Sequence, residues 1–172
     1  MPMKKLILLL TVAISFEYMA AQTNAAQPPY LRFPTIPPLK LLKVDSATYL
    51  TKDDIKKNHR TMVMYFSPEC EHCKHQTESI LASIDQFKDI EIVMATLLPF
   101  HEMKDFYEYY RIGDHPNIKM GWDQTATLRG FYSTMQSLPY LALYDKKGNL
   151  ITTFEGNQKV STIMDAFNKG RQ

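Results

Sequence analysis

The only two cysteines of this 172-residue chain, Cys70 and Cys73, are separated by just two residues. They follow an unbroken apolar run over residues 61–66 (TMVMYF), which is typical of a strand buried on both faces. After them, apolar residues recur at helical spacing, at Ile80, Leu81, Ile84 and Phe87. This pattern predicts that a strand passes into a helix at the cysteines, with Cys70 at the helix N-terminus.

A cysteine at a helix N-terminus is placed to act as a nucleophile. The unpaired backbone N–H groups and the positive end of the helix dipole favour the thiolate of Cys70 over the thiol. Cys73, one helical turn further on, is placed to attack a mixed disulfide formed at Cys70 and to release the partner. The motif therefore predicts thiol–disulfide exchange.

The N-terminus has the layout of a secretory signal. Lys4 and Lys5 precede an apolar run over residues 6–16, and small and polar residues follow it. Eleven apolar residues are few for a bilayer span, so an uncleaved N-terminal anchor is the weaker interpretation. We expect a signal peptide over residues 1–21 and a periplasmic or secreted protein, in which thiols can be oxidised.

The remaining chain predicts one globular domain. Residues 22–38 are rich in proline and are interpreted as a linker or an edge segment, followed by a domain over residues 39–172. The formal net charge is only +2, and no basic run is interleaved with aromatic residues, which gives no indication of nucleic-acid binding.

Apolar periodicity predicts alternating strands and helices and a sheet that is mostly parallel with an antiparallel edge. A short strand over residues 39–44 and a short helix or turn over 53–58 are expected before the cysteines. The aromatic stripe of the helix over residues 100–110 is interpreted as core rather than as a binding face. The other expected elements are strands over residues 61–66, 90–98, 117–122, 138–144 and 150–155, and helices up to 87, from 123 and over 160–167.

Two segments carry a resemblance to a known family. YFSPECEHCK at residues 65–74 and LPYLALYDKKGNL at residues 138–150 resemble thioredoxin-fold thiol-disulfide oxidoreductases, and most of all the exported TlpA/ResA-like group. Residues 100–123 resemble the helix and strand inserted in that group. The resemblance covers residues 39–168 and implies an α/β fold, a three-layer α/β/α sandwich with a mixed central sheet.

The resemblance also implies roles for individual residues. Cys70 would be the attacking thiol and Cys73 the resolving thiol. Pro139 would follow a cis peptide bond and face the disulfide, and the backbone of Leu138 would hold an extended substrate peptide. The implied partners are protein thiols and disulfides and a redox partner that recharges the site, with no cofactor beyond the dithiol.

The chain departs from the family at three positions. Met64 stands where thioredoxin has a buried Asp, and Glu69 replaces a common aromatic residue before the first cysteine. Gln76 stands where the TlpA/ResA-like group often has Glu, and Glu78 is near but out of register. The base that deprotonates Cys73 is therefore not identified, and His75 is a candidate by proximity only.

Three questions stay open at this stage. His72, with Glu71 beside it, would tune the redox potential, because a positive charge near the Cys70 thiolate favours the reduced form and thus an oxidant. Family resemblance instead favours a reductant. The alternatives to exchange chemistry are a copper- or zinc-binding module that adds His72 or His75 to the cysteines, and a scaffold in which the cysteines only staple the helix.

Overall fold

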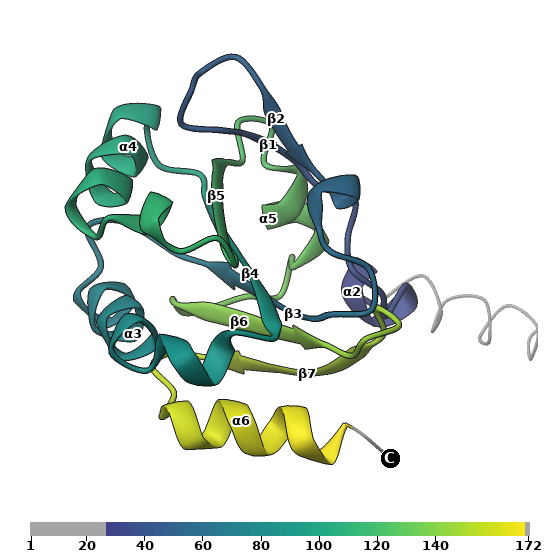
Figure 1. Cartoon of the computed structure of the whole chain (residues 1–172). Coiled ribbons are helices and arrows are strands. Elements are labelled where there is room, and N and C mark those ends of the chain that lie inside the picture. The colour runs from purple at the N-terminus through teal and green to yellow at the C-terminus, as the bar shows by residue number, and fades with distance from the viewer. Residues whose placement is uncertain (1–26, 171–172) are drawn as a thin grey trace, which may run out of the picture.

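A computed structural model describes residues 27–170 as one seven-stranded sheet with helices on both faces (Figure 1). The predicted signal peptide over residues 1–21 lies outside the described residues. The sheet order is β2-β1-β5-β4-β3-β6-β7. The strands are β1 (Lys40–Leu42), β2 (Tyr49–Thr51), β3 (Arg60–Tyr65), β4 (Ile90–Thr96), β5 (Ile118–Trp122), β6 (Tyr140–Tyr144) and β7 (Leu150–Glu155).

The expectation of a mostly parallel sheet was wrong. Among the described strands, only the pairs β3–β4 and β4–β5 are parallel, and the other four pairs are antiparallel. The turn at residues 145–149 makes β6 and β7 an antiparallel hairpin, as predicted, but β6 also runs antiparallel to β3. Its direction depends on how the long connection from β5 crosses the sheet, which strand periodicity does not encode. The three-residue strand β2 was not predicted at all.

Alternate residues of the central strands point to opposite faces of the sheet, and both faces are covered. Met62 and Met64 of β3 pack toward α3 (Glu71–Ala82), α4 (Phe100–Tyr109) and α6 (Val160–Lys169). Val63 and Tyr65 face α5 (Thr127–Phe131) and the short α2 (Pro29–Arg32). This arrangement is the expected three-layer α/β/α sandwich.

Three short 3-10 helices complete the described elements: η1 (Lys52–Asp54), η2 (Ile84–Phe87) and η3 (Ile112–Asp114). The helix expected to continue to Phe87 ends at Ala82, and the rest of the predicted stretch is η2. Phe87 is nevertheless fully buried, because the tighter turn still delivers its ring to the core.

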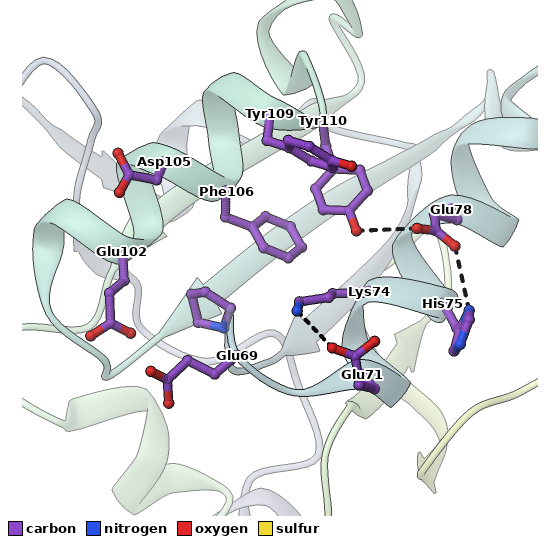
Figure 2. A pocket seen from close by; sticks show the side chains of 11 residues that line it. Glu69, Glu71, Lys74, His75, Glu78, Glu102, Asp105, Phe106, Tyr109 and Tyr110 are labelled. Atoms are coloured by element: carbon purple, nitrogen blue, oxygen red, sulfur yellow. Dashed lines mark hydrogen bonds and ion pairs between the residues drawn. The ribbon is translucent and has the colours of Figure 1, made fainter.

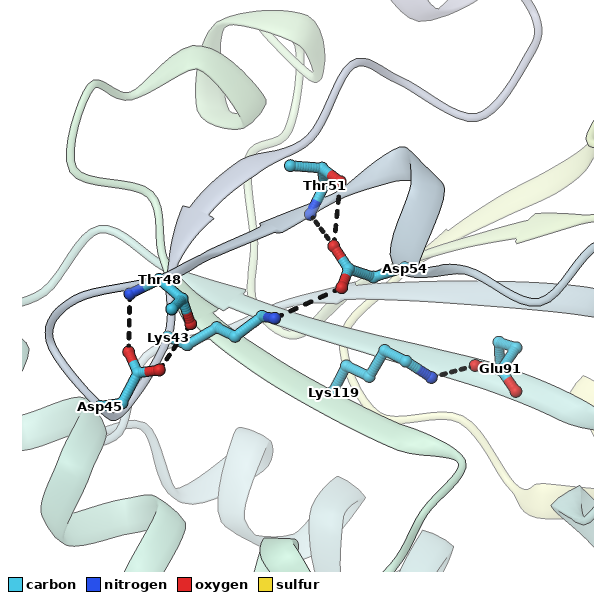
Figure 3. Close-up of polar contacts among 7 residues, drawn as sticks. All are labelled: Lys43, Asp45, Thr48, Thr51, Asp54, Glu91 and Lys119. Atoms are coloured by element: carbon cyan, nitrogen blue, oxygen red, sulfur yellow. Dashed lines mark hydrogen bonds and ion pairs between the residues drawn. The ribbon is translucent and has the colours of Figure 1, made fainter.

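Polar contacts fix the sheet margin that carries β1 and β2 (Figure 3). Asp54 accepts hydrogen bonds from the backbone and side chain of Thr51 and pairs with Lys43 at 3.3 Å. In the turn between the two strands, hydrogen bonds from Thr48 lower the pKa of Asp45 to about 2. Further in, the buried carboxylate of Glu91 on β4 pairs with Lys119 on β5 and with Lys56.

The described part of the proline-rich segment lies against the domain. Thr35 bridges to Asn149, and the backbone of Ile36 donates to the Gly148 carbonyl at 2.9 Å. Tyr30 packs its ring against Tyr132 and Tyr140. These contacts favour the edge-segment interpretation over a free linker for residues 30–36.

Candidate active site

Cys70 occupies the N-cap position of α3, directly after β3 and a short turn. Its carbonyl accepts from the amides of Cys73 and Lys74 at 2.9 and 3.0 Å, which starts the helix. The predicted passage from strand to helix at the cysteines is confirmed. Cys70 is a free cysteine and is partly exposed, in contrast to the buried Cys73.

Cys73 lies one turn into the same helix and is fully buried. Burial raises the pKa of its thiol from 9.0 to about 12, because a thiolate loses its hydration there. The hydrogen bond with Cys70 acts in the same direction, while a backbone contact with Ser67 opposes it. Neither cysteine is in a disulfide. Within one helical turn, Cys70 is therefore a partly exposed thiol and Cys73 is a buried, protonated thiol.

The loop before β6 faces this turn. The Leu138–Pro139 peptide bond is cis, as the family resemblance implied, and Pro139 is buried. The thiol of Cys70 donates to the carbonyl oxygen of Leu138 over a distance of 3.9 Å. Two segments 68 positions apart in the sequence therefore meet at the Cys70 sulfur.

Comparisons with known proteins identify the fold of this chain, and they do so through structure alone. Searches with protein-family models and among curated proteins find no match. A secreted disulfide oxidoreductase of Mycobacterium tuberculosis, homologous to E. coli DsbE, superposes with a TM-score of 0.61 at 12% identity, covering 76% of this chain and 94% of that one. The chain has the thioredoxin fold.

Two further solved structures give the same result. DsbF of Mycobacterium tuberculosis matches with a TM-score of 0.64 at 14% identity, over 78% of this chain and 98% of that one. StoA from Bacillus subtilis matches with a TM-score of 0.57 at 16% identity, over 77% of this chain and 98% of that one. The thioredoxin fold thus accounts for nearly the whole length of each neighbour.

Within this thioredoxin fold, the family's acidic positions hold neutral side chains. Met64 is buried among apolar residues beneath α3. Gln76, which is 1% exposed, donates to the carbonyl of Gln158 at 3.2 Å and accepts from its amide at 2.7 Å. A carboxylate could accept from the amide but would face the carbonyl oxygen without a proton to share. Gln76 therefore joins α3 to the segment after β7 through two hydrogen bonds.

The polar neighbours of the cysteines lie on the solvent side of α3. His72 and Glu71 are exposed, and Lys74 donates to Glu71 at 2.7 Å, which lowers the pKa of that carboxyl. His75 pairs with Glu78 at 3.4 Å on the surface, whereas Cys73 is fully buried. The structure gives His75 no contact that would make it the base for Cys73.

The metal-binding alternative gains no support. Among residues 27–170, no group of three or more His, Cys, Asp or Glu side chains is arranged to hold a metal ion.

None of the helices within residues 27–170 has both the length and the apolar character that a membrane span requires.

Sequence reasoning missed a pocket of about 700 Å³ between the start of α3 and α4 (Figure 2). Glu69 and Glu71, the neighbours of Cys70 in the chain, form one side of it, and α4 forms the other. The aromatic stripe of α4 is partly core, as predicted, since Phe106 is buried, but Tyr109 is 79% exposed. An exposed tyrosine on a predicted helix does not indicate a pocket, because the pocket exists only where α3 packs beside α4.

Proposed function

We propose that this protein is an exported thiol-disulfide oxidoreductase that reduces protein disulfides through Cys70 and Cys73. The observation that carries the proposal is the position of Cys70, half-exposed at the start of α3 with its sulfur facing the carbonyl of Leu138. A disulfide that approaches this sulfur meets the proposed nucleophile beside the backbone of Leu138, with the proposed resolving thiol one helical turn away.

The exchange has two steps. The Cys70 thiolate attacks one sulfur of the substrate disulfide, which forms a mixed disulfide and releases the other substrate sulfur as a thiolate that takes up a proton. Cys73 then gives up its proton and attacks the Cys70 sulfur. The second substrate sulfur leaves as a thiol, and the protein holds a Cys70–Cys73 disulfide, so two electrons have passed to the substrate. In this scheme, Leu138 and Pro139 position the substrate chain.

The reducing direction is supported by the environment of Cys73. A strong oxidant needs its reduced form stabilised, usually as a thiolate. Burial instead raises the pKa of the Cys73 thiol to about 12, so at Cys73 the reduced form gains none of the thiolate stabilisation that a strong oxidant uses. Exposed His72 and Glu71 act on the site through solvent, which screens their charges.

The test is the reduction of insulin disulfides by the reduced protein. We expect the native protein to reduce insulin, Cys70→Ser to lose the activity, and Cys73→Ser to accumulate a mixed disulfide visible by mass spectrometry. Insulin reduction that persists in Cys70→Ser would overturn the assignment. Circular dichroism of both variants shows that the fold is retained.

Direction and export need separate measurements. Equilibration with glutathione should give a potential near that of thioredoxin, about −270 mV, and a value near about −120 mV, as in DsbA, would show an oxidant. Export rests on the signal predicted over residues 1–21, and the DsbE-like structural neighbour from Mycobacterium tuberculosis is itself a secreted protein. N-terminal sequencing of protein recovered outside the cytoplasm should show that this segment has been removed.

A further inference from the structure

The pocket between α3 and α4 has a distinct chemical character. Among the described residues that line it, five carry carboxylates, and only Lys74 and His75 can carry a positive charge. Both of these are already paired on α3, Lys74 with Glu71 at 2.7 Å and His75 with Glu78 at 3.4 Å. The pocket wall therefore carries a surplus of negative charge, and two of its acids, Glu69 and Glu71, flank Cys70 in the chain. The five carboxylates are Glu69, Glu71, Glu78, Glu102 and Asp105.

Three of these acids have no cation to balance them. Glu69, Glu102 and Asp105 form no side-chain hydrogen bond or ion pair within residues 27–170. In particular, Oε2 of Glu102 is buried and lacks any hydrogen-bond partner in that range. A buried carboxylate oxygen without a donor is costly, and a ligand that supplies a donor relieves this cost. The pocket thus contains a carboxylate oxygen that lacks a hydrogen-bond donor.

The other wall offers aromatic faces. Tyr109 is 79% exposed and meets the ring of Tyr110 edge-on, with centroids 4.9 Å apart. Figure 2 shows both rings on the side of the pocket nearer Lys74 and Glu78, with Phe106 between them and the carboxylates of Glu102 and Asp105. Carboxylates together with an open aromatic ring suit a guanidinium group, which binds carboxylates through paired hydrogen bonds and stacks on aromatic faces.

The negative pocket is not a result of overall composition, because the chain has a net positive charge. One group of lysines lies at the other end of β3, before β3 begins and after β6 ends. There Lys56, Lys57, Lys146 and Lys147 line a separate pocket. The acids therefore stand at the cysteine end of β3, separate from this group of lysines.

We propose that the pocket between α3 and α4 binds an arginine side chain of the polypeptide whose disulfide reacts at Cys70. The inference rests on the proposed function and names its substrate class: disulfides with an arginine a few residues away. The exchange itself is unchanged, with two electrons passing from the dithiol to the peptide disulfide. The pocket contributes to the encounter and holds the peptide chain next to the sulfur.

The test compares two synthetic disulfide peptides that differ at one position, arginine in one and glutamine in the other. We expect the reduced protein to react with the arginine peptide about tenfold faster or more, as one well-formed charged contact provides. In Glu102→Gln/Asp105→Asn the two peptides should react within about twofold of each other, the range left by screened surface charges. Added salt should reduce the native preference.

A matched control keeps the result specific. Asp165→Asn removes an exposed acid from α6, far along the chain from the pocket, and should retain the full preference. Equal rates for the two peptides with the native protein would overturn the inference. Loss of the preference in Asp165→Asn as well would do the same, because it would show a general charge effect.

The glutamine peptide separates the two proposals. If the native protein reduces the glutamine peptide and the arginine peptide at the same rate, the pocket inference fails while the proposed function stands. If the native protein reduces neither peptide, the proposed function fails instead. Binding of a peptide with serines in place of cysteines to a Cys70→Ser/Cys73→Ser variant gives a readout independent of chemistry: the arginine form should bind and the glutamine form should not.

Discussion

Cys70 and Cys73 share one helical turn but have opposite environments. The first caps the helix and is partly exposed beside Leu138, and the second is fully buried with a thiol pKa of about 12. A three-residue offset keeps both side chains on one face of the helix, one turn apart, so Cys70 lies at the partly exposed helix end and Cys73 lies deeper, in the core. One motif thus places a partly exposed cysteine and a buried one within a single turn, as the proposed exchange requires.

The largest expected effect is a difference in alkylation. At pH 7, iodoacetamide should modify Cys70 at least about a hundredfold faster than Cys73, because the reagent needs a thiolate and access to it. Peptide mapping by mass spectrometry after timed quenching measures both rates. In urea the two rates should converge, and similar rates in the native protein would show that the two thiols do not differ as described.

The buried thiol should also make stability depend on alkaline pH. The pKa of Cys73 is about 12 in the folded protein and 9.0 for an ordinary thiol, so above pH 9 the unfolded chain loses this proton first. Proton loss then favours unfolding, and stability should fall by about 1.4 kcal/mol per pH unit from this group. Below pH 9 the group has no such effect.

Urea unfolding of the reduced protein at about pH 8, 9 and 10 measures this slope. Cys73→Ala should fall less steeply over the same range, whereas Cys70→Ala should follow the native protein more closely. If Cys73→Ala keeps the native slope, other groups such as the buried tyrosines account for the loss, since burial also raises the pKa of Tyr132 and Tyr144.

Gln76→Glu should weaken the structure near the resolving thiol. A carboxylate there faces the carbonyl of Gln158, and we expect a loss of about 1–3 kcal/mol at pH 7. Burial would raise the pKa of the new carboxyl, so the loss should vanish as pH falls below about 4.3, its unfolded value. Urea unfolding at pH 7 and about pH 4 checks both, with exposed Glu78→Gln as the control. If Gln76→Glu is as stable as the native protein at pH 7, the hydrogen bonds between Gln76 and Gln158 contribute little to stability.

The smallest effect is expected at the exposed neighbour of Cys70. Glu71→Gln removes the pair with Lys74, but both side chains lie in solvent, where charges are screened. The rate of insulin reduction should change by less than about threefold. A larger change in this assay would show that Glu71 tunes the sulfur directly, as the sequence first suggested.

Local signals predicted the part of the site that depends on neighbouring residues. The apolar strand, the cysteine spacing and the later periodicity were enough to place Cys70 at the start of a helix. The resemblance to known oxidoreductases added the cis bond before Pro139. These features come from short segments whose sequence determines their own backbone.

Contacts between distant segments could not be predicted in this way. Gln158 meets Gln76 across 82 positions, and nothing near either residue indicates the pairing. The acids of the pocket come from two helices, and only the packing of α3 against α4 shows that Glu69 and Glu102 share a space. The direction of β6 belongs to the same class, since it depends on a crossing of the sheet.

The separation of acids and lysines along β3 has a consequence for encounters in solution. A molecule with negative charge at one end and positive charge at the other has an electric dipole moment, and a positively charged chain turns it before the two touch. The cysteine end would then lead the collision more often than chance allows. Orientation in this way raises the association rate without any further contact, and it weakens as ionic strength rises.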